Sequence, residues 1–498
     1  MPQHIIIAGG GSAGWMAAAL FARLRPAPLT RITLVESDAI GTIGVGEATV
    51  PILQDFNRLL GVHEPEFVAA TQGSFKLGIE FVDWGHLGNR HFHGFGDFGA
   101  PIEGTAPHHH WHRLRTAGRE QDPIDAWSMP AILARQDRFA PPEASRGEAA
   151  EYRYAYHFDA GLYACLLRSY AQSRGVAHME GRIVDVERDP HSGDVAALRL
   201  DGDRRLDGDI FIDCTGFASR LLGAELGVAL VDWSGWLPAN RAIAQGSARA
   251  GRFTPFTRST ALTAGWQWRI PLQHRTGNGL VYSSRYLSDD EAAHILTSNL
   301  DGDAIGEPRL LRFTTGRREQ FWAHNVIAIG LAAGFMEPLE STSLQLVQTG
   351  LARLAELLPH GRVAPPIRTE YNRETIAEYE RIRDFLIAHY CISQRPEPFW
   401  RDSANMALPD TLTHKLALWD AMGRVPMYDL ESHAEPSWAA ILLGQGRIPQ
   451  GHDPAADRMS LESMAALVAA RRDTLQAAAA RLPQHDHFVR RTCHAQAA

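Results

Sequence analysis

Three glycines near the start of the chain have the spacing of a dinucleotide-binding turn. Gly9, Gly11 and Gly14 form G-x-G-x-x-G between an apolar run and an alanine-rich stretch of helical character. In such a turn the first glycine allows the bend, the second lets the backbone approach a pyrophosphate, and the third lets helix and strand pack closely. The positive end of the helix favours the phosphate charge. Glu36 follows at a spacing that suits an acceptor for a ribose hydroxyl.

Ser12 lies in a pattern that also fits a hydrolase. Gly10-x-Ser12-x-Gly14 matches the G-x-S-x-G turn, which exposes a nucleophilic serine between a strand and a helix. A hydrolase of that kind needs several strands and an oxyanion loop earlier in the chain. Here Ser12 follows the first predicted strand, so we favour the dinucleotide interpretation, with Ser12 and Ala13 in the phosphate-binding turn.

Two tryptophans far downstream could control what reaches a bound ring. The segment Gly265–Pro271 reads Gly-Trp-Gln-Trp-Arg-Ile-Pro. On a strand, side chains at i and i+2 point to the same face, so Trp266 and Trp268 would form one flat apolar wall. Pro271 has no N–H to donate and should end the strand. Core packing alone would explain such a wall, but beside a flavin it would limit access to the ring.

The segments around these residues alternate between strand and helix patterns. His4–Ala8 predicts a buried strand, Trp15–Leu24 a helix and Arg31–Val35 a second strand, together a βαβ unit. A helix is expected at Phe158–Tyr170, and a block of strands from about residue 225 to 285. Further strands are predicted at Arg182–Val186, Ala196–Leu200, Asp209–Asp213 and Asn325–Gly330, the last running into a helix from about residue 341.

The last quarter of the chain has a helical pattern. Apolar residues recur at helical spacing in Glu374–Tyr390 and again between Met464 and Leu475. The tail after Pro483 is polar, and we expect it to be mobile.

Bulk composition is that of an ordinary soluble protein. The 498 residues carry a formal net charge of −8, which gives no reason to expect nucleic acid or an anionic membrane as partner. The four cysteines are widely spaced and indicate neither a disulfide scaffold nor a zinc site. No apolar run is long enough for a transmembrane helix, and the glycine-broken N-terminal stretch is not typical of a signal peptide. We therefore expect a cytoplasmic protein.

Two later segments favour FAD over NAD. Asp209–Gly216 resembles the second glycine motif of FAD-dependent monooxygenase-type proteins, and Ile327–Gly334 resembles their third, which lies along the flavin. This resemblance implies that Gly330 and Leu331 contact the cofactor. The one other G-x-G-x-x-G, Gly94–Gly99, does not lie between a predicted strand and a predicted helix, so a separate NAD(P)H-dependent flavin reductase would supply the reduced flavin.

Six segments together resemble the flavin-dependent halogenases of the tryptophan halogenase family. They occur in family order and are GGGSAGW (9–15), GVGEATVP (44–51), FKLGI (75–79), YAYHFDA (154–160), GWQWRIP (265–271) and EPLEST (337–342). The resemblance implies an α/β fold: a Rossmann-type, monooxygenase-like FAD module with an inserted β-rich substrate layer over residues 1–370, and a helical cap over 371–498. It also implies a role for Ala48 in binding FAD.

The resemblance implies the chemistry as well. In that family, reduced FAD, O2 and halide give hypohalous acid, which travels to a lysine beside the arene, while the tryptophan motif keeps the arene from the flavin. Lys76 matches that lysine. An ammonium can polarise hypohalous acid, and an amine that burial keeps neutral can form a haloamine. Glu340 matches the glutamate that orients the halogenating species and could accept the arenium proton. Ser341 would connect Glu340 with Lys76.

Halide and substrate residues follow from the same resemblance. Thr342 and Ser343 match the backbone halide site at a helix N-terminus. The family commonly has glycine where this chain has Ser343, so the sequence leaves the preference between chloride and bromide open. His93 and Phe95 match residues that flank the aromatic substrate. Where tryptophan enzymes hold the amino-acid end with a tyrosine pair, this chain has Trp438 and Ala439, which favours free or substituted indole.

Four histidines near residue 110 invite a metal interpretation. His108, His109, His110 and His112 have no carboxylate or cysteine at a known ligand spacing, so we expect a polar loop and no metal.

The sequence thus favours an FADH2-dependent halogenase of an indole-like arene. Three alternatives stay open: a tryptophan halogenase proper, an FAD-dependent aromatic monooxygenase without halogenation, and a non-enzymatic protein that binds FAD and an aromatic ligand.

Overall fold

The computed structural model describes residues 2–25, 27–39 and 46–495, which form two compact units. The first unit comprises Met1–Gly73, Phe158–Ser234 and Phe313–Tyr379, and the second comprises Ser74–His157, Gly235–Arg312 and Glu380–Ala498. The chain therefore contributes three separate segments to each unit. The expected boundary near residue 370 falls inside helix α9 (Pro365–Cys391), whose residues are divided between the units.

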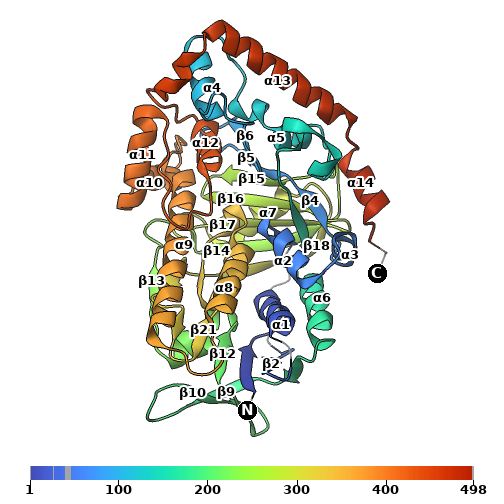
Figure 1. Ribbon diagram of the computed structural model, residues 1–498, viewed down its shortest axis with the longest axis vertical. Coiled ribbons are helices and arrows are strands. Elements are labelled where there is room, and N and C mark those ends of the chain that lie inside the picture. The colour runs from blue at the N-terminus through green and yellow to red at the C-terminus, as the bar shows by residue number, and fades with distance from the viewer. Residues whose placement is uncertain (1, 26, 40–45, 496–498) are drawn as a thin grey trace. The chain divides into compact units, whose positions relative to one another are not determined.

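A six-stranded sheet forms the centre of the first unit (Figure 1). Its order is β20-β21-β12-β1-β2-β8, and β1 pairs in parallel with both β2 and β12. The strands are β1 (Gln3–Ala8), β2 (Thr30–Glu36), β8 (Ala177–Glu180), β12 (Ile210–Asp213), β20 (Trp322–Ala323) and β21 (Val326–Ala328). Parallel strands joined by helices are the arrangement of a Rossmann-type fold. The predicted fold class is confirmed, and so is the predicted βαβ unit.

Helix α1 (Ser12–Leu24) connects β1 to β2 and fixes the first unit's core. Every residue of β1 is buried, and α1 is buried from Gly14 to Ala22. It packs against α6 (Ala160–Gln172) and α8 (Ser343–Leu357). Because both faces of β1 are covered, its segment Ile5–Ala8 is apolar and has no polar face.

The start of α6 corrects one prediction. The expected helix from Phe158 begins two residues later, at Ala160, because Phe158 still belongs to strand β7 (Ala155–Asp159). The carboxylate of Asp159 caps α6 by accepting hydrogen bonds from the N–H groups of Gly161 and Leu162.

The rest of the first unit consists of small sheets and helices. One sheet has the order β11-β10-β9 and another β13-β19-β22. The bounds are β3 (Gly46–Ala48), β9 (Ile183–Arg188), β10 (Val195–Leu200), β11 (Arg204–Asp207), β13 (Leu230–Asp232), β19 (Gly316–Arg318), β22 (Gly334–Phe335), α2 (Ile52–Leu60) and α3 (Glu64–Ala70). The strands predicted within Arg182–Leu200 are confirmed as β9 and β10.

A seven-stranded sheet dominates the second unit, with the order β18-β14-β17-β16-β15-β5-β6 (Figure 1). Neighbours are antiparallel except β15 and β5. The strands are β5 (Gly78–Val82), β6 (Arg90–Gly94), β14 (Arg241–Ser247), β15 (Thr257–Leu262), β16 (Gly265–Pro271), β17 (Thr276–Tyr282) and β18 (Ala304–Arg312). The predicted block of strands is confirmed, and Pro271 is the last residue of β16. Strand β4 (Ser74–Lys76) pairs antiparallel with β7.

Helices cover much of the second unit. They are α4 (Pro107–Thr116), α5 (Met129–Arg135), α7 (Asp289–Ser298), α10 (Pro398–Ala404), α11 (Asp410–Met422), α12 (Glu435–Gly444), α13 (Leu461–Arg481) and α14 (His485–Thr492). The prediction of a mobile tail after Pro483 is wrong, because that segment forms α14 and buries His485 and Val489. The four cysteines are free. No helix among the described residues has the length and apolarity needed to cross a membrane.

Candidate functional site

The glycine-rich turn has the geometry that its spacing predicts. Gly9 has φ 108°, in the left-handed region that favours glycine. A Cβ on Gly14 would lie 1.9 Å from the carbonyl oxygen of Gly9, so only glycine lets α1 approach β1 this closely. A Cβ on Gly11, in contrast, would meet no atom within 4 Å. Helix α1 begins here without a side-chain cap and without an acidic residue in its first turn. These features leave backbone N–H groups and space for a phosphate.

Glu36 lies directly beside this turn. A Cβ on Gly10 would be 1.6 Å from Oε2 of Glu36, which places the carboxylate against the turn. The other oxygen, Oε1, is 2.9 Å from Nε2 of His178 and 3.4 Å from Arg168. Two basic groups therefore orient Glu36, a feature that the sequence did not reveal.

The third glycine motif meets the first. Gly330 has φ 70°, and a Cβ on it would be 2.9 Å from Cβ of Ala13. Leu331 follows in a short 3-10 helix, Gly330–Ala332. The predicted strand Asn325–Gly330 is shorter than expected, Val326–Ala328, because the chain turns at Gly330. The structure thus brings Gly9–Gly14, Glu36 and Gly330 together at one edge of the six-stranded sheet.

The GVGEATVP segment is described only in part, since Gly44 and Val45 lie outside the described residues. Ala48 is buried in β3. Burial, with a smaller contribution from the neighbouring carboxylate of Asp159, raises the pKa of Glu47 to about 7.

The EPLEST segment ends at the N-terminus of α8. Glu340 and Thr342 are buried, and Ser341 has φ 60°, a left-handed conformation that is uncommon for serine. Residues held in such conformations cluster at functional sites. Thr342 is the N-cap of α8 but makes no side-chain capping bond, and Ser343 is the first helical residue. The N–H groups of this first turn therefore have no side-chain cap, as a backbone anion site requires.

Lys76 is completely buried, which is rare for lysine. It ends strand β4, and its Nζ lies 5.0 Å from the centre of the Phe95 ring. An ammonium over an aromatic face is attracted by the ring's negative quadrupole. The structure thus brings together two of the predicted site residues. Lys76 belongs to the second unit, whereas Glu340, Ser341, Thr342 and Ser343 belong to the first.

His157 connects the lysine strand with the tryptophan strand. Ser74 Oγ donates a hydrogen bond to the carbonyl oxygen of Pro271 at 2.7 Å, so it accepts from Nδ1 of His157 at 3.0 Å. Nε2 of His157 then accepts from Thr257 Oγ1 at 2.9 Å. Burial, and then the nearby Lys76 and His485, hold the pKa of His157 well below its usual range. A neutral imidazole therefore joins β4, β7, β15 and β16. In the sequence His157 lies within the YAYHFDA segment, where nothing local indicates this role.

His485 is a second residue that the sequence analysis missed. It is fully buried at the start of α14, its Nε2 accepts a hydrogen bond from the N–H of Phe75, and its Nδ1 donates to the carbonyl of Phe253. Burial lowers its pKa to about 4. The only signal in the sequence was the helical spacing of His485 and Val489, which places both on one face of a helix. The polar composition of the tail concealed this signal.

Trp266 and Trp268 lie on one face of β16, as predicted, and both are buried. Their ring centroids are 6.1 Å apart, but the planes are inclined by 57°, so the wall is not flat. The reason is local: a Cβ on Gly279, opposite Trp268 on β17, would be 2.0 Å from Cζ2 of Trp268. The Trp268 ring therefore lies over a position without a side chain.

His93 and Trp438 are linked through Phe385. The ring centroids of His93 and Phe385 are 5.9 Å apart, and those of Phe385 and Trp438 are 4.9 Å apart with edge-to-face geometry. Trp438 is fully buried in α12, and Nζ of Lys415 lies 5.0 Å from its ring. Among the described residues, its indole N–H has no hydrogen-bond partner.

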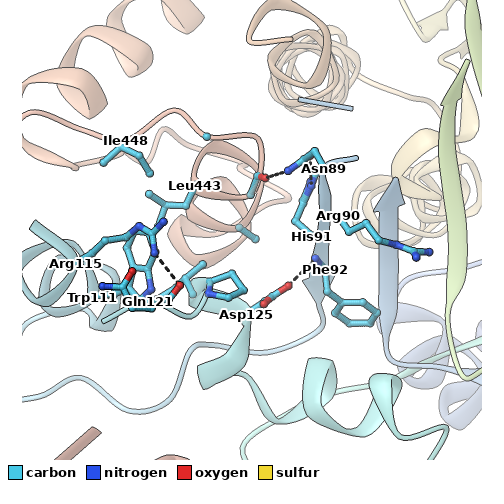
Figure 2. Close-up of a pocket in the computed structure, with 15 residues that line it drawn as sticks. Asn89, Arg90, His91, Phe92, Trp111, Arg115, Gln121, Asp125, Leu443 and Ile448 are labelled. Carbon is cyan, nitrogen blue, oxygen red and sulfur yellow. Dashed lines mark hydrogen bonds between the residues drawn. The ribbon is translucent and has the colours of Figure 1, made fainter. Parts of the chain in front are cut away.

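A cavity of about 280 Å3 lies between β6, α4 and α12 (Figure 2). Trp111, Arg115 and Gln121 line one side, and Leu443 and Ile448 line another. The Trp111 indole donates to the carbonyl of Asp122, and the Arg115 guanidinium lies over the Trp111 ring at 5.3 Å. The predicted site residues are absent from this lining.

The histidine run is not the polar loop we expected. His108, His109, His110 and His112 are buried in helix α4. Nε2 of three of them donates to backbone carbonyls: His108 to Gly423, His110 to Ile102 and His112 to Pro449. The fold also brings Glu435 to His108 and His109, with possible ligand atoms within 4.8 Å of one another. The spacing in the sequence could not show this, because Glu435 lies more than 300 residues away.

Comparison with known proteins gives a consistent result. The family model described as tryptophan halogenase matches residues 4–461. The tryptophan 6-halogenase of Streptomyces toxytricini is 33% identical over 91% of this chain and 91% of its own length. The tryptophan 7-halogenase of Lentzea aerocolonigenes is 33% identical over 84% of this chain and 82% of its own.

Solved structures are similar over the whole chain. A flavin-dependent halogenase from Xanthomonas campestris has a TM-score of 0.96 and 45% identity, and all of each chain is covered. A flavin-dependent halogenase from Brevundimonas sp. BAL3 has a TM-score of 0.95 and 44% identity over 99% of each chain.

Proposed function

Because the chain belongs to the tryptophan halogenase family and is a flavin-dependent halogenase, we propose that it halogenates free or substituted indole with FADH2, O2 and halide. A separate NAD(P)H-dependent flavin reductase would supply FADH2. The observation that carries the proposal is the buried Lys76, with its ammonium over the Phe95 ring.

The residues of the first unit fit FAD. The open space at Gly11 and the uncapped start of α1 suit a pyrophosphate held by Gly9, Gly11, Ser12, Ala13 and Gly14. Glu36 would accept a hydrogen bond from a ribose hydroxyl. Ala48, Gly330 and Leu331 would contact the flavin. When bound and reduced, FAD supplies the oxidation of halide by O2 to hypohalous acid. Thr342 and Ser343 would hold the halide through the first-turn N–H groups of α8.

In the proposed reaction Lys76 activates the oxidant. Its ammonium donates a hydrogen bond to the oxygen of hypohalous acid and transfers that proton as the halogen–oxygen bond breaks, so that the oxygen leaves as water. The halogen forms a bond to the arene carbon. The carboxylate of Glu340 accepts the proton that this carbon loses, and Ser341 orients the carboxylate. Burial of Lys76 excludes water, which strengthens its hydrogen bond to the oxidant.

The substrate pocket favours an uncharged arene. His93 and Phe95 would flank the ring, and the tryptophan wall (Trp266 and Trp268) would keep it from the flavin, so that hydroxylation does not compete. Trp438 supports indole over tryptophan, because a buried indole offers no hydroxyl to an amino-acid zwitterion and packs on Phe385 instead.

The test is a halogenation assay with reductase, FAD, NADH and bromide, on indole and on tryptophan in parallel. We expect a product with the bromine isotope pair from indole and little from tryptophan. Lys76→Met should abolish product while FAD binding, followed by flavin absorbance, is unchanged. Lys76→Arg keeps the cation but cannot form a haloamine, so residual activity in it would support hydrogen bonding to the oxidant.

Other outcomes would select another function. Preferential bromination of tryptophan would make the protein a tryptophan halogenase proper. A hydroxylated product without halogen would indicate a monooxygenase, and no product from a broad arene panel, with FAD bound, would leave a binding protein.

A further inference from the structure

A second, larger cavity lies within the second unit. It has a volume of about 430 Å3, within the range of small-molecule sites. Among the described residues that line it, five are arginines: Arg90, Arg135, Arg252, Arg258 and Arg269. Glu80, Asp301, Thr254 and Thr276 add polar groups.

The cavity lies on the face of the seven-stranded sheet opposite the tryptophan wall. Successive side chains of a strand point to opposite faces, so Arg269 of β16 points away from the face of Trp266 and Trp268. The same alternation applies on β6, where Figure 2 shows Arg90 directed away from the smaller cavity. The site is therefore distinct from the residues proposed above for halogenation.

Two of the arginines are direct cross-strand neighbours. Arg258 of β15 pairs in register with Arg269 of β16 on one side and Glu80 of β5 on the other. Like charges directly opposite each other destabilise a sheet unless an anion compensates them. Glu80 provides part of this compensation, since one of its oxygens lies 3.0 Å from Arg258 and 3.4 Å from Arg90.

The remaining acids do not balance the cavity. Arg269 pairs with Asp301, Arg252 with Asp137 and Arg135 with Asp125. Because Arg258 and Arg90 share Glu80, five guanidinium groups are paired with four carboxylates. One positive charge is therefore not compensated. Within the described part of the chain, the buried Nε of Arg269 has no hydrogen-bond partner. Burial, and then Arg258, lower the pKa of Arg269 to about 10, which still leaves it charged at neutral pH.

We propose that this cavity binds a small anionic molecule through a carboxylate or phosphate group held by Arg258 and Arg269. Planar guanidinium groups match both anions with paired hydrogen bonds. The hydroxyl of Thr276 can donate a further bond. Such a ligand would contact β16 from the side opposite the tryptophans.

The test uses the full-length protein and calorimetric titration with inorganic phosphate and, separately, succinate, at constant ionic strength and without halide. We expect saturable binding of at least one anion with one site per chain. Binding of phosphate only, or of succinate only, would identify the group that the cavity recognises. Arg269→Gln should weaken binding by roughly tenfold or more, the scale of a charged hydrogen bond.

Two further variants make the result specific. Arg258→Gln should weaken binding in the same way and serves as the second variant if Arg269→Gln does not fold. Arg285→Gln removes an arginine whose side chain is 77% exposed and should leave affinity unchanged. The proposal is overturned by the absence of saturable binding of both anions, or by binding that survives Arg269→Gln or Arg258→Gln in folded protein. Equal weakening in Arg285→Gln would also overturn it, because it would show attraction by net charge only.

Discussion

The backbone N–H of Phe75 donates a hydrogen bond of 3.2 Å to Nε2 of His485, although 410 residues of chain separate them. Phe75 immediately precedes Lys76 on β4, and the Phe75 ring lies edge-on to the His485 ring. The C-terminal helix α14 therefore fixes the strand that carries the proposed catalytic lysine. His485 is a positioning residue in this arrangement.

Replacing His485 by Phe should lower both stability and turnover. The substitution keeps an aromatic ring but leaves the buried N–H of Phe75 and the carbonyl of Phe253 without this partner. Each unsatisfied group lowers the free energy of unfolding by about 1–3 kcal/mol. Denaturant unfolding measures the loss, and the rate of indole halogenation should fall at unchanged FAD affinity. His487→Phe, at an exposed position on the same helix, is the matched control and should behave as wild type.

The stabilisation by His485 should depend on pH. Its pKa is lowered to about 4 in the folded protein from 6.5 in the unfolded chain, so the unfolded state binds the proton more readily between these values. The contribution is complete above pH 6.5 and is lost as the pH falls toward 4. As the pH falls from 6.5 toward 4, the difference in unfolding free energy between wild type and His485→Phe should therefore decrease. Per pH unit, the ratio of the two unfolding equilibrium constants should change by roughly tenfold. A difference independent of pH would show that His485 titrates normally.

Two glycine substitutions should separate cofactor binding from folding. An added Cβ at Gly11 meets no protein atom within 4 Å, whereas at Gly14 it would lie 1.9 Å from the Gly9 carbonyl. Gly11→Ala should thus leave the apoprotein's melting temperature unchanged but weaken FAD binding, because the methyl group occupies the space proposed for the pyrophosphate. Gly14→Ala should lower the melting temperature even without FAD. Full FAD affinity in Gly11→Ala would place the pyrophosphate elsewhere.

Gly279→Ala should displace the Trp268 ring. The new methyl group would overlap Cζ2 of the indole, and overpacking of this kind costs about 1–3 kcal/mol. The signal of the change is an altered near-ultraviolet circular dichroism spectrum together with a lower melting temperature. Adding Trp268→Phe removes the overlapping part of the ring and should restore stability. If the double variant is no more stable than Gly279→Ala, the overlap is not the cause.

The sequence was most informative where short segments determine structure by themselves. The turn at Gly9–Gly14, the strand before it, the helix after it and the paired tryptophans of β16 were predicted because each depends on spacing within a few residues. The boundary at Asp159 shows the limit of this reasoning, because a single capping carboxylate decides where α6 begins.

Features that depend on distant partners were not predictable. The histidines of α4 look like a polar loop in the sequence, yet His108 and His112 are buried because the carbonyls of Gly423 and Pro449 accept hydrogen bonds from them. The tilt between Trp266 and Trp268 depends on Gly279 of the neighbouring strand. His485 gains its role only from Phe75, which no local pattern indicates.

The division of the chain into alternating segments has a consequence for its synthesis. Strand β1 precedes every other strand of its sheet along the chain, but the sheet also needs β12 and β21, and the first unit is complete only at Tyr379. A ribosome must therefore release the chain through β21 before the edge that carries the glycine-rich turn has all its neighbours. A chain that stops at Arg312 lacks a segment of each unit, so neither can be produced by simple truncation.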